Sequence, residues 1–553
     1  MDVVLVGLPG SGKSAVGRRL ASRHGATFVD LDDRIEQEAG ARVPAIFAEE
    51  GEAGFRARER QAIGGLGPAD ATSELGRVIA PGGGAIVDPR NRWGLYRGRL
   101  VLWLDGRPEV LAQRLRRSPN VRPLIAGRDP IGTLRELAES RARFYAAGRR
   151  IAGTAEVATV VDAADAQVAA ARADSRLVGG TVLLRAETRI GRIVVGEDIA
   201  VGSIEDALDA LGATRAIVVS EPGAWAAAGE AIAGALAASG RHVERLMLPQ
   251  GEAAKTMATV ESAARELARL RVERREPLVA IGGGALGDAV GFLAATYLRG
   301  VPIVHVPTTL IGQVDSALGG KTAIDLPEGK NLVGAFHQPA AVVIDIALLA
   351  TLPERERRAG LTEVVKMAVL GDERLFELLE TSGEAIANGD RAAFEQGAVA
   401  EAVERAAWAK VEVVVADERD AGGRLALNLG HSIGHAVEAA GGYRDLRHGE
   451  AVAVGLRAAC RIGVALGVTP AERAARVERL LDRLGLGRDL LPYSIEAVED
   501  ALGTDKKHAG GRLRWVLPTE SSSTIRDDVP DALVARVTAG LLEPISAVAG
   551  GRA

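Results

Sequence analysis

Cysteine is almost absent from this sequence, which limits how the fold can be held together. Its 553 residues include a single cysteine, Cys460. One thiol cannot form an intramolecular disulfide and cannot build a cysteine zinc cluster. Any metal ion must therefore be bound by histidine and carboxylate side chains.

Long apolar segments are also missing. Apolar stretches are interrupted by arginine, for example at Arg457 and Arg461, and the first residues carry no positive charge. A helix that crosses a membrane needs about 20 predominantly apolar residues, and a secretory signal begins with basic residues. We therefore expect a cytoplasmic protein with no membrane partner.

Positive charge is not in excess. The formal net charge is -5, and no basic run is interleaved with aromatic residues. Proteins that bind nucleic acid present a basic surface to the phosphates, so nucleic acid is not expected as a partner. The balance of 47% apolar and 25% charged residues is typical of globular domains.

The length requires more than one domain, because a single core rarely serves more than about 300 residues. Short apolar strands alternate with amphipathic helices at the start and again after about residue 190, which is typical of α/β domains. After about Pro353 helical periodicity replaces the strands. We expect an α/β domain over residues 1–170, a linker over 171–190, a second α/β domain over 191–352 and an all-helical domain over 353–545.

A glycine-rich loop with the spacing of a P-loop lies near the start of the chain. It follows the predicted strand Val3 to Val6, precedes a predicted helix and reads Gly7-Leu8-Pro9-Gly10-Ser11-Gly12-Lys13-Ser14. Glycines let backbone N–H groups surround phosphate oxygens, the lysine reaches the β and γ phosphates, and the serine holds Mg²⁺. We predict an ATP site formed by Gly10, Ser11, Gly12, Lys13 and Ser14, with Lys13 also catalytic.

Further polar motifs follow this loop. They are Asp30-Leu31-Asp32, Phe55-Arg56, Gly82-Gly83-Gly84, Asn120-Val121-Arg122-Pro123 and Arg141. In sequence and order they resemble the shikimate kinase family over residues 1 to about 170. The resemblance implies a P-loop kinase domain with a parallel sheet and flanking helices.

The same resemblance implies a role for each motif. Asp30 joins Ser14 in holding Mg²⁺, and Asp32 binds the acceptor hydroxyl and takes its proton. Arg122 contacts ATP and neutralises charge on the transferring phosphoryl group. A planar guanidinium suits a carboxylate, and the implied shikimate-binding set is Asp32, Arg56, Gly82, Gly83, Gly84 and Arg141.

A second glycine-rich turn follows the apolar run Leu278 to Ile281 and reads Gly282-Gly283-Gly284-Ala285-Leu286-Gly287-Asp288. Such a turn admits a dinucleotide pyrophosphate, but without the usual GxGxxG spacing it leaves a ligand-free turn equally open. Further motifs around it favour a site, among them Glu252-Ala253-Ala254-Lys255, Thr308-Thr309 and Gly319-Gly320-Lys321-Thr322. Together they resemble 3-dehydroquinate synthase from about residue 190 to Asp505-Lys506-Lys507.

Three of the eight histidines lie in one short stretch, at His431, His435 and His448. If Leu427 to Ala440 is helical, His431 and His435 share one face, and spacing alone makes them a ligand pair. The resemblance implies a different set. It assigns Zn²⁺ or another divalent cation to Glu363, His431 and His448, with His435 facing the substrate.

The resemblance implies two further sets of residues, one for NAD⁺ and one for a phosphorylated sugar acid. Glu221, an acidic residue after a strand, is expected to accept the ribose hydroxyls. The NAD⁺ set is Glu221, Glu252, Lys255, Gly283, Gly284, Ala285, Asp288, Thr308, Thr309, Lys330 and Thr351. The substrate set is Arg299, Asp315, Lys321, Asn331, Lys366, Lys410, Arg424, Asn428, His435, Lys506 and Lys507, of which Lys321, Lys410 and His435 are expected to be catalytic.

The two resemblances together imply a fusion of two enzymes. We expect ATP-dependent phosphorylation of shikimate to shikimate 3-phosphate. We also expect NAD⁺- and zinc-dependent conversion of 3-deoxy-D-arabino-heptulosonate 7-phosphate to 3-dehydroquinate with release of phosphate. The synthase family further implies a homodimer formed through the second half of the chain.

Two alternatives remain open at this point. One is a different P-loop metabolite kinase fused to a metal-dependent polyol dehydrogenase, which would accumulate NADH and release no phosphate. The other is a regulatory chain with a decayed site. The presence of Lys13, Asp32, Glu363, His431 and His448 gives no support to decay.

Overall fold

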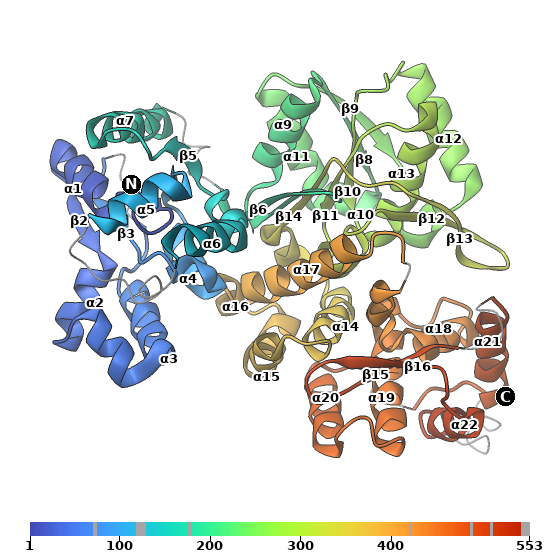
Figure 1. Ribbon diagram of the computed structural model, residues 1–553. Helices are drawn as coiled ribbons and strands as arrows, with labels where there is room; N and C mark the ends of the chain where they lie inside the picture. The colour runs from blue at the N-terminus through green and yellow to red at the C-terminus, as the bar shows by residue number, and fades with distance from the viewer. Residues whose placement is uncertain are drawn as a thin grey trace. The chain divides into compact units, whose positions relative to one another are not determined.

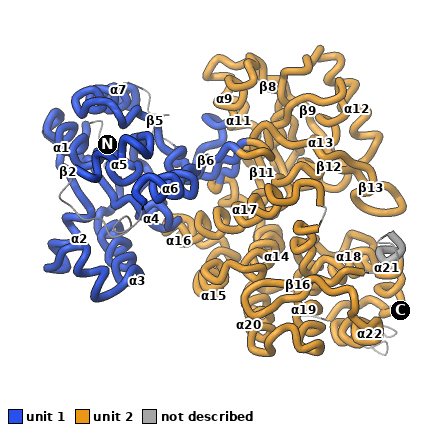
Figure 2. The backbone as a smooth tube through the Cα atoms, in the orientation of Figure 1, with its two compact units in different colours: residues 1–187, 192–203, 343–345 blue, residues 188–191, 204–342, 346–553 orange. Residues whose placement is uncertain are grey.

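The computed structural model describes residues 1–69, 74–117, 129–173, 180–420, 422–486, 490–508 and 513–542. The chain divides into two compact units, which Figure 2 shows in different colours. Unit 1 comprises residues 1–187, 192–203 and 343–345, and unit 2 comprises residues 188–191, 204–342 and 346–553. Among the described helices, none has the length and apolar character needed to cross a membrane.

Unit 1 contains a parallel sheet of five strands in the order β2-β3-β1-β4-β5 (Figure 1). The strands are β1 (Asp2–Val6), β2 (Thr27–Asp30), β3 (Arg77–Ala80), β4 (Leu100–Asp105) and β5 (Arg149–Ala152). Every residue of β1 is buried, as expected for a central strand whose two faces are both covered by helices. The α/β architecture predicted for the first domain is confirmed.

Helices connect these strands and cover the sheet. They are α1 (Lys13–His24), α2 (Leu31–Ala39), α3 (Val43–Gly64), η1 (Ala85–Val87), α4 (Pro89–Tyr96), α5 (Pro108–Arg116), α6 (Pro130–Tyr145) and α7 (Val157–Ala173). Leu20 of α1 and Val168 of α7 form one core with Val3 and Leu5 of β1. Because alternate residues of a strand share a face, α1 and α7 cover the same face of the sheet.

A second sheet has seven strands in the order β6-β7-β14-β11-β10-β8-β9. Its strands are β6 (Thr181–Thr188), β7 (Gly191–Glu197), β8 (Arg215–Ser220), β9 (His242–Met247), β10 (Leu278–Gly282), β11 (Ile303–Pro307) and β14 (Ala341–Asp345). The pairs from β14 to β9 are parallel. β8, β10 and β11 end in register at one edge, and the residues that follow them there are Glu221, Gly283 and Thr308.

Helices and one hairpin complete this α/β half. The helices are α9 (Ala200–Leu211), α10 (Pro222–Ala224), η2 (Trp225–Gly229), α11 (Glu230–Ala238), η3 (Gly251–Ala254), α12 (Met257–Arg269), α13 (Gly284–Thr296), η4 (Tyr297–Arg299), η5 (Gly312–Ser316) and η6 (Ile346–Thr351). Strands β12 (Lys321–Leu326) and β13 (Gly329–Phe336) pair antiparallel. The hairpin places Lys321, Lys330 and Asn331 in the wall of the cavity described below.

The C-terminal half of unit 2 is helical, as predicted, with one small exception. Its helices are α14 (Glu354–Val369), α15 (Glu373–Asn388), α16 (Arg391–Glu395), α17 (Ala398–Ala416), η7 (Gly423–Asn428), α18 (His431–Ala440), α19 (His448–Ala465), α20 (Ala471–Arg483), α21 (Ile495–His508) and α22 (Asp531–Ala539). The exception is an antiparallel ribbon of β15 (Trp515–Pro518) and β16 (Ser523–Arg526). This ribbon was not predicted from the sequence.

The continuous helix considered for Leu427 to Ala440 is interrupted. η7 ends at Asn428, Gly430 takes a left-handed conformation with φ of 80°, and α18 begins at His431. Glycine adopts this conformation without steric cost. His431 therefore begins a helix, and it still lies one turn from His435 on the same face.

Close backbone contacts join α19 to α14 and to the start of α18. A Cβ atom on Gly449 would lie 1.9 Å from the carbonyl oxygen of Ala359 in α14. A Cβ atom on Gly455 would lie 1.7 Å from the carbonyl oxygen of Gly430. Only glycine permits such an approach, so these contacts fix the three helices that carry the histidines and Glu363.

Gly455→Ala should destabilise the protein by about 3 kcal/mol or more, because its methyl group meets a backbone carbonyl that moves only if α18 moves. Gly234→Ala is the matched control, since no atom lies within 4 Å of the added carbon. Alanine is preferred to glycine within a helix by about 1 kcal/mol. Denaturant unfolding should therefore give a lower midpoint for the first variant only, and equal stability of Gly455→Ala and the parent would contradict this packing.

Candidate active sites

The P-loop of unit 1 joins the end of β1 to the start of α1. Gly10 and Gly12 adopt φ values of 83° and 91°, the left-handed conformation that favours glycine. The ammonium group of Lys13 donates to the carbonyl oxygens of Gly7 at 2.9 Å and Leu8 at 3.4 Å. The lysine thus lies over the loop into which phosphate oxygens would bind.

The two predicted Mg²⁺ residues touch each other. The hydroxyl of Ser14 in α1 donates to Asp30 Oδ2 at 2.7 Å. Asp30 ends β2, and its Oδ1 accepts from the backbone N–H of Asp32 at 3.2 Å, which caps α2. A hydroxyl and a carboxylate beside a phosphate-binding loop fit the oxygen ligands that Mg²⁺ requires.

The predicted shikimate residues also gather around the glycine run that follows β3. A Cβ atom on Gly82 would lie 2.8 Å from Asp32 Oδ1, and one on Gly84 would lie 2.5 Å from the Arg56 guanidinium. Arg141 donates to the carbonyl oxygen of Gly83 at 2.5 Å. Any side chain at Gly82 or Gly84 would therefore displace the polar groups of this site.

Glu59 is a member of this site that the sequence analysis missed. It lies one helical turn after Arg56 in α3, and Arg56 Nη1 donates to its Oε2 at 2.9 Å. Its side chain is 1% exposed. Burial raises the pKa of the Glu59 carboxyl, the charge of Arg56 opposes this, and the Asp32 carboxylate adds to it. The acidic residue three positions after Arg56 was the available signal.

Unit 2 contains a cavity of about 1290 Å³. Its wall combines the edge of the sheet, the β12–β13 hairpin and the helical half. Most of the predicted NAD⁺ and substrate residues line it, namely Glu221, Glu252, Lys255, Gly283, Gly284, Ala285, Asp288, Thr308, Thr309, Asp315, Lys321, Lys330, Asn331, Thr351, Lys410, Arg424, His435 and His448.

One end of this cavity carries the second glycine turn. The carboxylate of Glu221 is buried and accepts from the backbone N–H groups of Gly251 at 2.7 Å and Gly283 at 3.3 Å. Lys255 contacts Asn331 and donates to Asp288 Oδ2 at 2.9 Å. Glu221 therefore joins two loops at this edge of the sheet, in addition to the role predicted for it.

The charges on Asp288 and Lys255 depend on each other. Burial raises the pKa of the Asp288 carboxyl to about 6, although Lys255 opposes this. Burial also lowers the pKa of Lys255, but Asp288 and Glu252 outweigh burial and leave that pKa raised. The lysine is thus held in its charged form beside the glycine turn.

The middle of the cavity carries a compact group of opposite charges. Asp315 Oδ1 lies 2.6 Å from Lys410 Nζ and 3.6 Å from Lys366 Nζ. Burial alone would raise the pKa of the Asp315 carboxyl, but the two ammonium groups outweigh it and hold that pKa well below its usual range. Burial lowers the pKa of Lys410. Lys366 pairs in turn with Glu363, which connects this group to the histidines.

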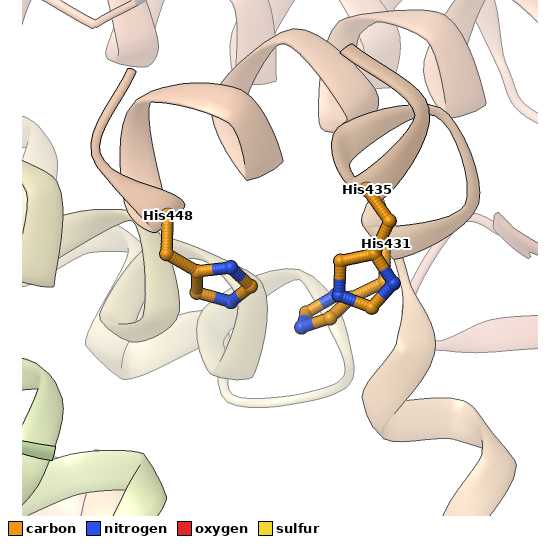
Figure 3. A group of neighbouring side chains, drawn as sticks. All are labelled: His431, His435 and His448. Atoms are coloured by element: carbon orange, nitrogen blue, oxygen red, sulfur yellow. The ribbon is translucent and has the colours of Figure 1, made fainter. Parts of the chain in front are cut away.

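The three histidines converge from two helices, as Figure 3 shows. Each offers a ring nitrogen, and these atoms lie within 4.8 Å of one another. Glu363 Oε1 of α14 lies 3.7 Å from His431 Nε2 and 3.9 Å from His448 Nε2. Burial and the charge of Lys366 lower the pKa of His431 well below its usual value, which keeps the ring neutral as a metal ligand must be.

These residues fit a divalent cation. The side chain of Glu363 is 1% exposed; its Oε2 pairs with the ammonium group of Lys366, and its Oε1 faces Nε2 of His431 and of His448. A buried carboxylate requires a positive partner, and neutral imidazoles with a carboxylate are preferred ligands of Zn²⁺ and Co²⁺. The site can therefore bind such an ion in competition with Lys366.

Some predicted residues lie elsewhere or are not described. Arg299 and Asn428 are exposed and do not line the cavity. Lys321 pairs with Asp420 at 2.5 Å, and Arg424 donates to the carbonyl oxygens of Gly319 and Glu418. Arg122 lies outside the described residues, and so do the side chains of Lys506 and Lys507.

Three family models match the chain. Residues 245–359 match the N-terminal domain of 3-dehydroquinate synthase, and residues 360–508 match its C-terminal domain. Residues 9–169 match shikimate kinase. The two synthase matches meet at residue 360 inside α14 and together cover residues 245–508.

Known 3-dehydroquinate synthases resemble this chain over most of their own length. The 3-dehydroquinate synthase of Synechococcus sp. is 44% identical over 334 residues, which are 60% of this chain and 90% of the relative. The enzyme of the same name from Thermosynechococcus vestitus is 45% identical over 321 residues, 58% of this chain and 86% of the relative.

Solved structures of related enzymes share the fold. A 2-epi-5-epi-valiolone synthase from Streptomyces hygroscopicus with NAD⁺ and Zn²⁺ bound is 30% identical, with a TM-score of 0.57 over 63% of this chain and 96% of that one. A 2-deoxy-scyllo-inosose synthase with carbaglucose-6-phosphate, NAD⁺ and Co²⁺ is 25% identical, with a TM-score of 0.56 over 66% and 100%.

These matches select the synthase over the polyol dehydrogenase that the sequence analysis left open. They cover both halves of the predicted fusion. The chain belongs to the 3-dehydroquinate synthase family and carries, ahead of its synthase domains, a shikimate kinase domain at residues 9–169.

Proposed function

We propose that this chain catalyses two reactions at separate sites. Unit 1 transfers a phosphoryl group from ATP to shikimate, and unit 2 converts 3-deoxy-D-arabino-heptulosonate 7-phosphate to 3-dehydroquinate with release of phosphate. The observation that carries the second activity is a single cavity lined both by the glycine turn and by His435 and His448, with buried Glu363 3.9 Å from His448 Nε2. A dinucleotide and a cation can act together on one substrate there.

The kinase residues take the following roles. The P-loop N–H groups and Lys13 bind the β and γ phosphates, and Ser14 with Asp30 holds Mg²⁺, which neutralises charge between the phosphates. Asp32 accepts the proton of the attacking hydroxyl. Arg56 and Arg141 bind the carboxylate of shikimate beside the backbone of Gly82, Gly83 and Gly84. Arg122 is assigned to the transferring phosphoryl group on family resemblance alone.

The proposed metal ligands are Glu363, His431 and His448. In both histidines Nδ1 lies near an acceptor, at 3.1 Å from the carbonyl oxygen of Leu429 and 3.0 Å from Glu438 Oε2, while Nε2 faces Glu363. This pattern of a fixed outer nitrogen and a free inner one is typical of metal-bound imidazole. A bound Zn²⁺ or similar cation would act as a Lewis acid toward a substrate hydroxyl.

The proposed cofactor is NAD⁺, which accepts and returns a hydride in this chemistry. The backbone of Gly283, Gly284 and Ala285 at the start of α13 offers N–H groups to its phosphates. The remaining members of the NAD⁺ set are Glu221, Glu252, Lys255, Asp288, Thr308, Thr309, Lys330 and Thr351. Their position at the edge of a parallel sheet is where dinucleotides bind in such folds.

Lysine and arginine side chains hold the substrate between the proposed metal site and the glycine turn. Lys410, Lys366, Arg424 and Lys321 can pair with its carboxylate and phosphate, and His435 faces it from the cavity wall. Asp315 lies 2.6 Å from Lys410 Nζ and 3.6 Å from Lys366 Nζ and offsets the charge of both. Asn331, Arg299, Asn428, Lys506 and Lys507 stay assigned to the substrate on family resemblance, as do a homodimer formed through unit 2 and a cytoplasmic location.

Purified protein tests both activities. With MgATP and shikimate it should form ADP and shikimate 3-phosphate. With NAD⁺, Zn²⁺ and the heptulosonate phosphate it should release one phosphate per 3-dehydroquinate without net NADH. Net NADH without phosphate would instead identify a dehydrogenase, and inactivity of monodisperse, metal-loaded protein would refute the proposal.

The two activities should be separable by single substitutions. Lys13→Ala should lower kinase kcat by about 100-fold or more by removing phosphate stabilisation, and His431→Ala should abolish only the synthase. Each variant serves as the control for the other, because one polypeptide carries both sites. Loss of both activities from either substitution would mean that the sites are structurally coupled.

Glu59→Gln should weaken shikimate binding, because Arg56 loses its buried charged partner and keeps only the exposed Glu52, at 3.1 Å. We expect KM for shikimate to rise about 10-fold, corresponding to about 1.4 kcal/mol, while KM for ATP and synthase activity stay unchanged. Arg58→Gln in the same helix is the matched control, since Arg58 pairs with Glu50 at 2.7 Å. An unchanged KM for shikimate in Glu59→Gln would show that Glu59 does not orient Arg56.

A further inference from the structure

Glu438, which lies beside the histidine cluster, was not among the residues predicted from the sequence. It is on α18, one turn beyond His435, and its side chain is 3% exposed. Its Oε2 lies 3.0 Å from Nδ1 of His448, and its Oε1 lies 3.6 Å from Nζ of Lys330. A buried carboxylate with these two partners is held between the metal-binding half and the hairpin that carries Lys330.

The contact with Glu438 decides which nitrogen of His448 faces the cluster. With Nδ1 donating to Glu438, the lone pair of Nε2 points toward Glu363, whose Oε1 is 3.9 Å away. His431 obtains the same orientation from a backbone carbonyl, that of Leu429 at 3.1 Å. His448 begins α19 after a loop, so its orientation depends on a side chain that can be substituted.

Lys330 extends this contact to the cofactor end of the cavity. Its Nζ lies 3.3 Å from Oε1 of Glu252 in η3 and 5.0 Å from the centre of the Tyr443 ring. Glu252 is 51% exposed, so its pairing is the weaker of the two. The ammonium group of Lys330 thus lies between the carboxylate of Glu252, at the cofactor end, and that of Glu438, which contacts His448.

We propose that Glu438 is a positioning residue for the metal ligand His448, and that Lys330 links it to the cofactor end of the cavity through Glu252. The proposal rests on the proposed function of unit 2, since it requires His448 to bind the cation. Partners of this kind raise the basicity of the ligand and fix its ring. Metal binding and NAD⁺ binding then influence each other through Lys330.

The role of Glu438 is tested by the affinity of the full-length apoprotein for Zn²⁺ or Co²⁺, measured by competition with a chromophoric chelator. Glu438→Ala should weaken metal binding by about 10- to 100-fold. Glu438→Gln should lose less, because its amide oxygen can still accept from Nδ1. The visible spectrum of bound Co²⁺ should change in Glu438→Ala and stay close to that of the parent in Glu438→Gln.

Glu401→Gln is the control for general destabilisation. Glu401 is also a helical carboxylate with a side chain 1% exposed, and it pairs with Arg374 and Arg405 rather than with a histidine. It should lower thermal stability without changing the affinity for metal. Equal metal affinity in Glu438→Ala and the parent would overturn the positioning role, whereas a parent that binds no metal would overturn the proposed function itself.

Lys330→Met tests the link. In the parent, saturating NAD⁺ should change the dissociation constant of the metal by about fivefold or more, and the metal should change that of NAD⁺ equally. In Lys330→Met each ligand should have nearly the same dissociation constant with and without the other, so that both ratios approach one, even though NAD⁺ itself binds more weakly. A ratio unchanged from the parent would show that Lys330 carries no coupling.

Discussion

The metal-binding half depends on how closely three helices approach one another around a buried carboxylate. Gly449 lets α19 lie against α14, and Gly455 lets it lie against the start of α18. This packing brings Glu363 to within 4 Å of two histidines from different helices. Burying a carboxylate is costly unless another charge compensates it. The helix contacts are therefore stable only together with a positive partner, which is either Lys366 or a bound cation.

The same balance of charge extends across the cavity. Asp315 separates Lys366 from Lys410, and without it two ammonium groups would face each other away from water. A phosphorylated sugar acid brings negative charge of its own, so a surplus of cations in the wall is useful rather than destabilising. The charged groups of the site in unit 1 are arranged differently. There Glu59 holds Arg56 from behind, and the glycine run leaves room for the guanidinium groups to meet the ligand.

The sequence was sufficient for the residues whose chemistry is local. Spacing alone located the P-loop, whereas the second glycine turn also needed the motifs around it, and the alternation of strands and helices predicted the α/β architecture. Glu59 and Glu438 were not predicted, because each acts on another side chain. An acidic residue one turn after Arg56 was a signal for the first, whereas Glu438 is separated from His448 by ten positions and a loop. The helix break at Gly430 was not predicted either, since a lone glycine within a helical pattern does not by itself mark a helix boundary.

The proposal of Glu363 as the third metal ligand rests on charge rather than on distance. His431, His435 and His448 lie close enough for all three to bind one ion, so proximity alone would choose them. Three neutral rings would leave both positive charges of a divalent cation in a buried site, whereas Glu363 in place of His435 removes one of them. His435 lines the cavity, where an imidazole can exchange a proton with a bound substrate. Charge compensation therefore favours Glu363 as the ligand and leaves His435 to act on the substrate.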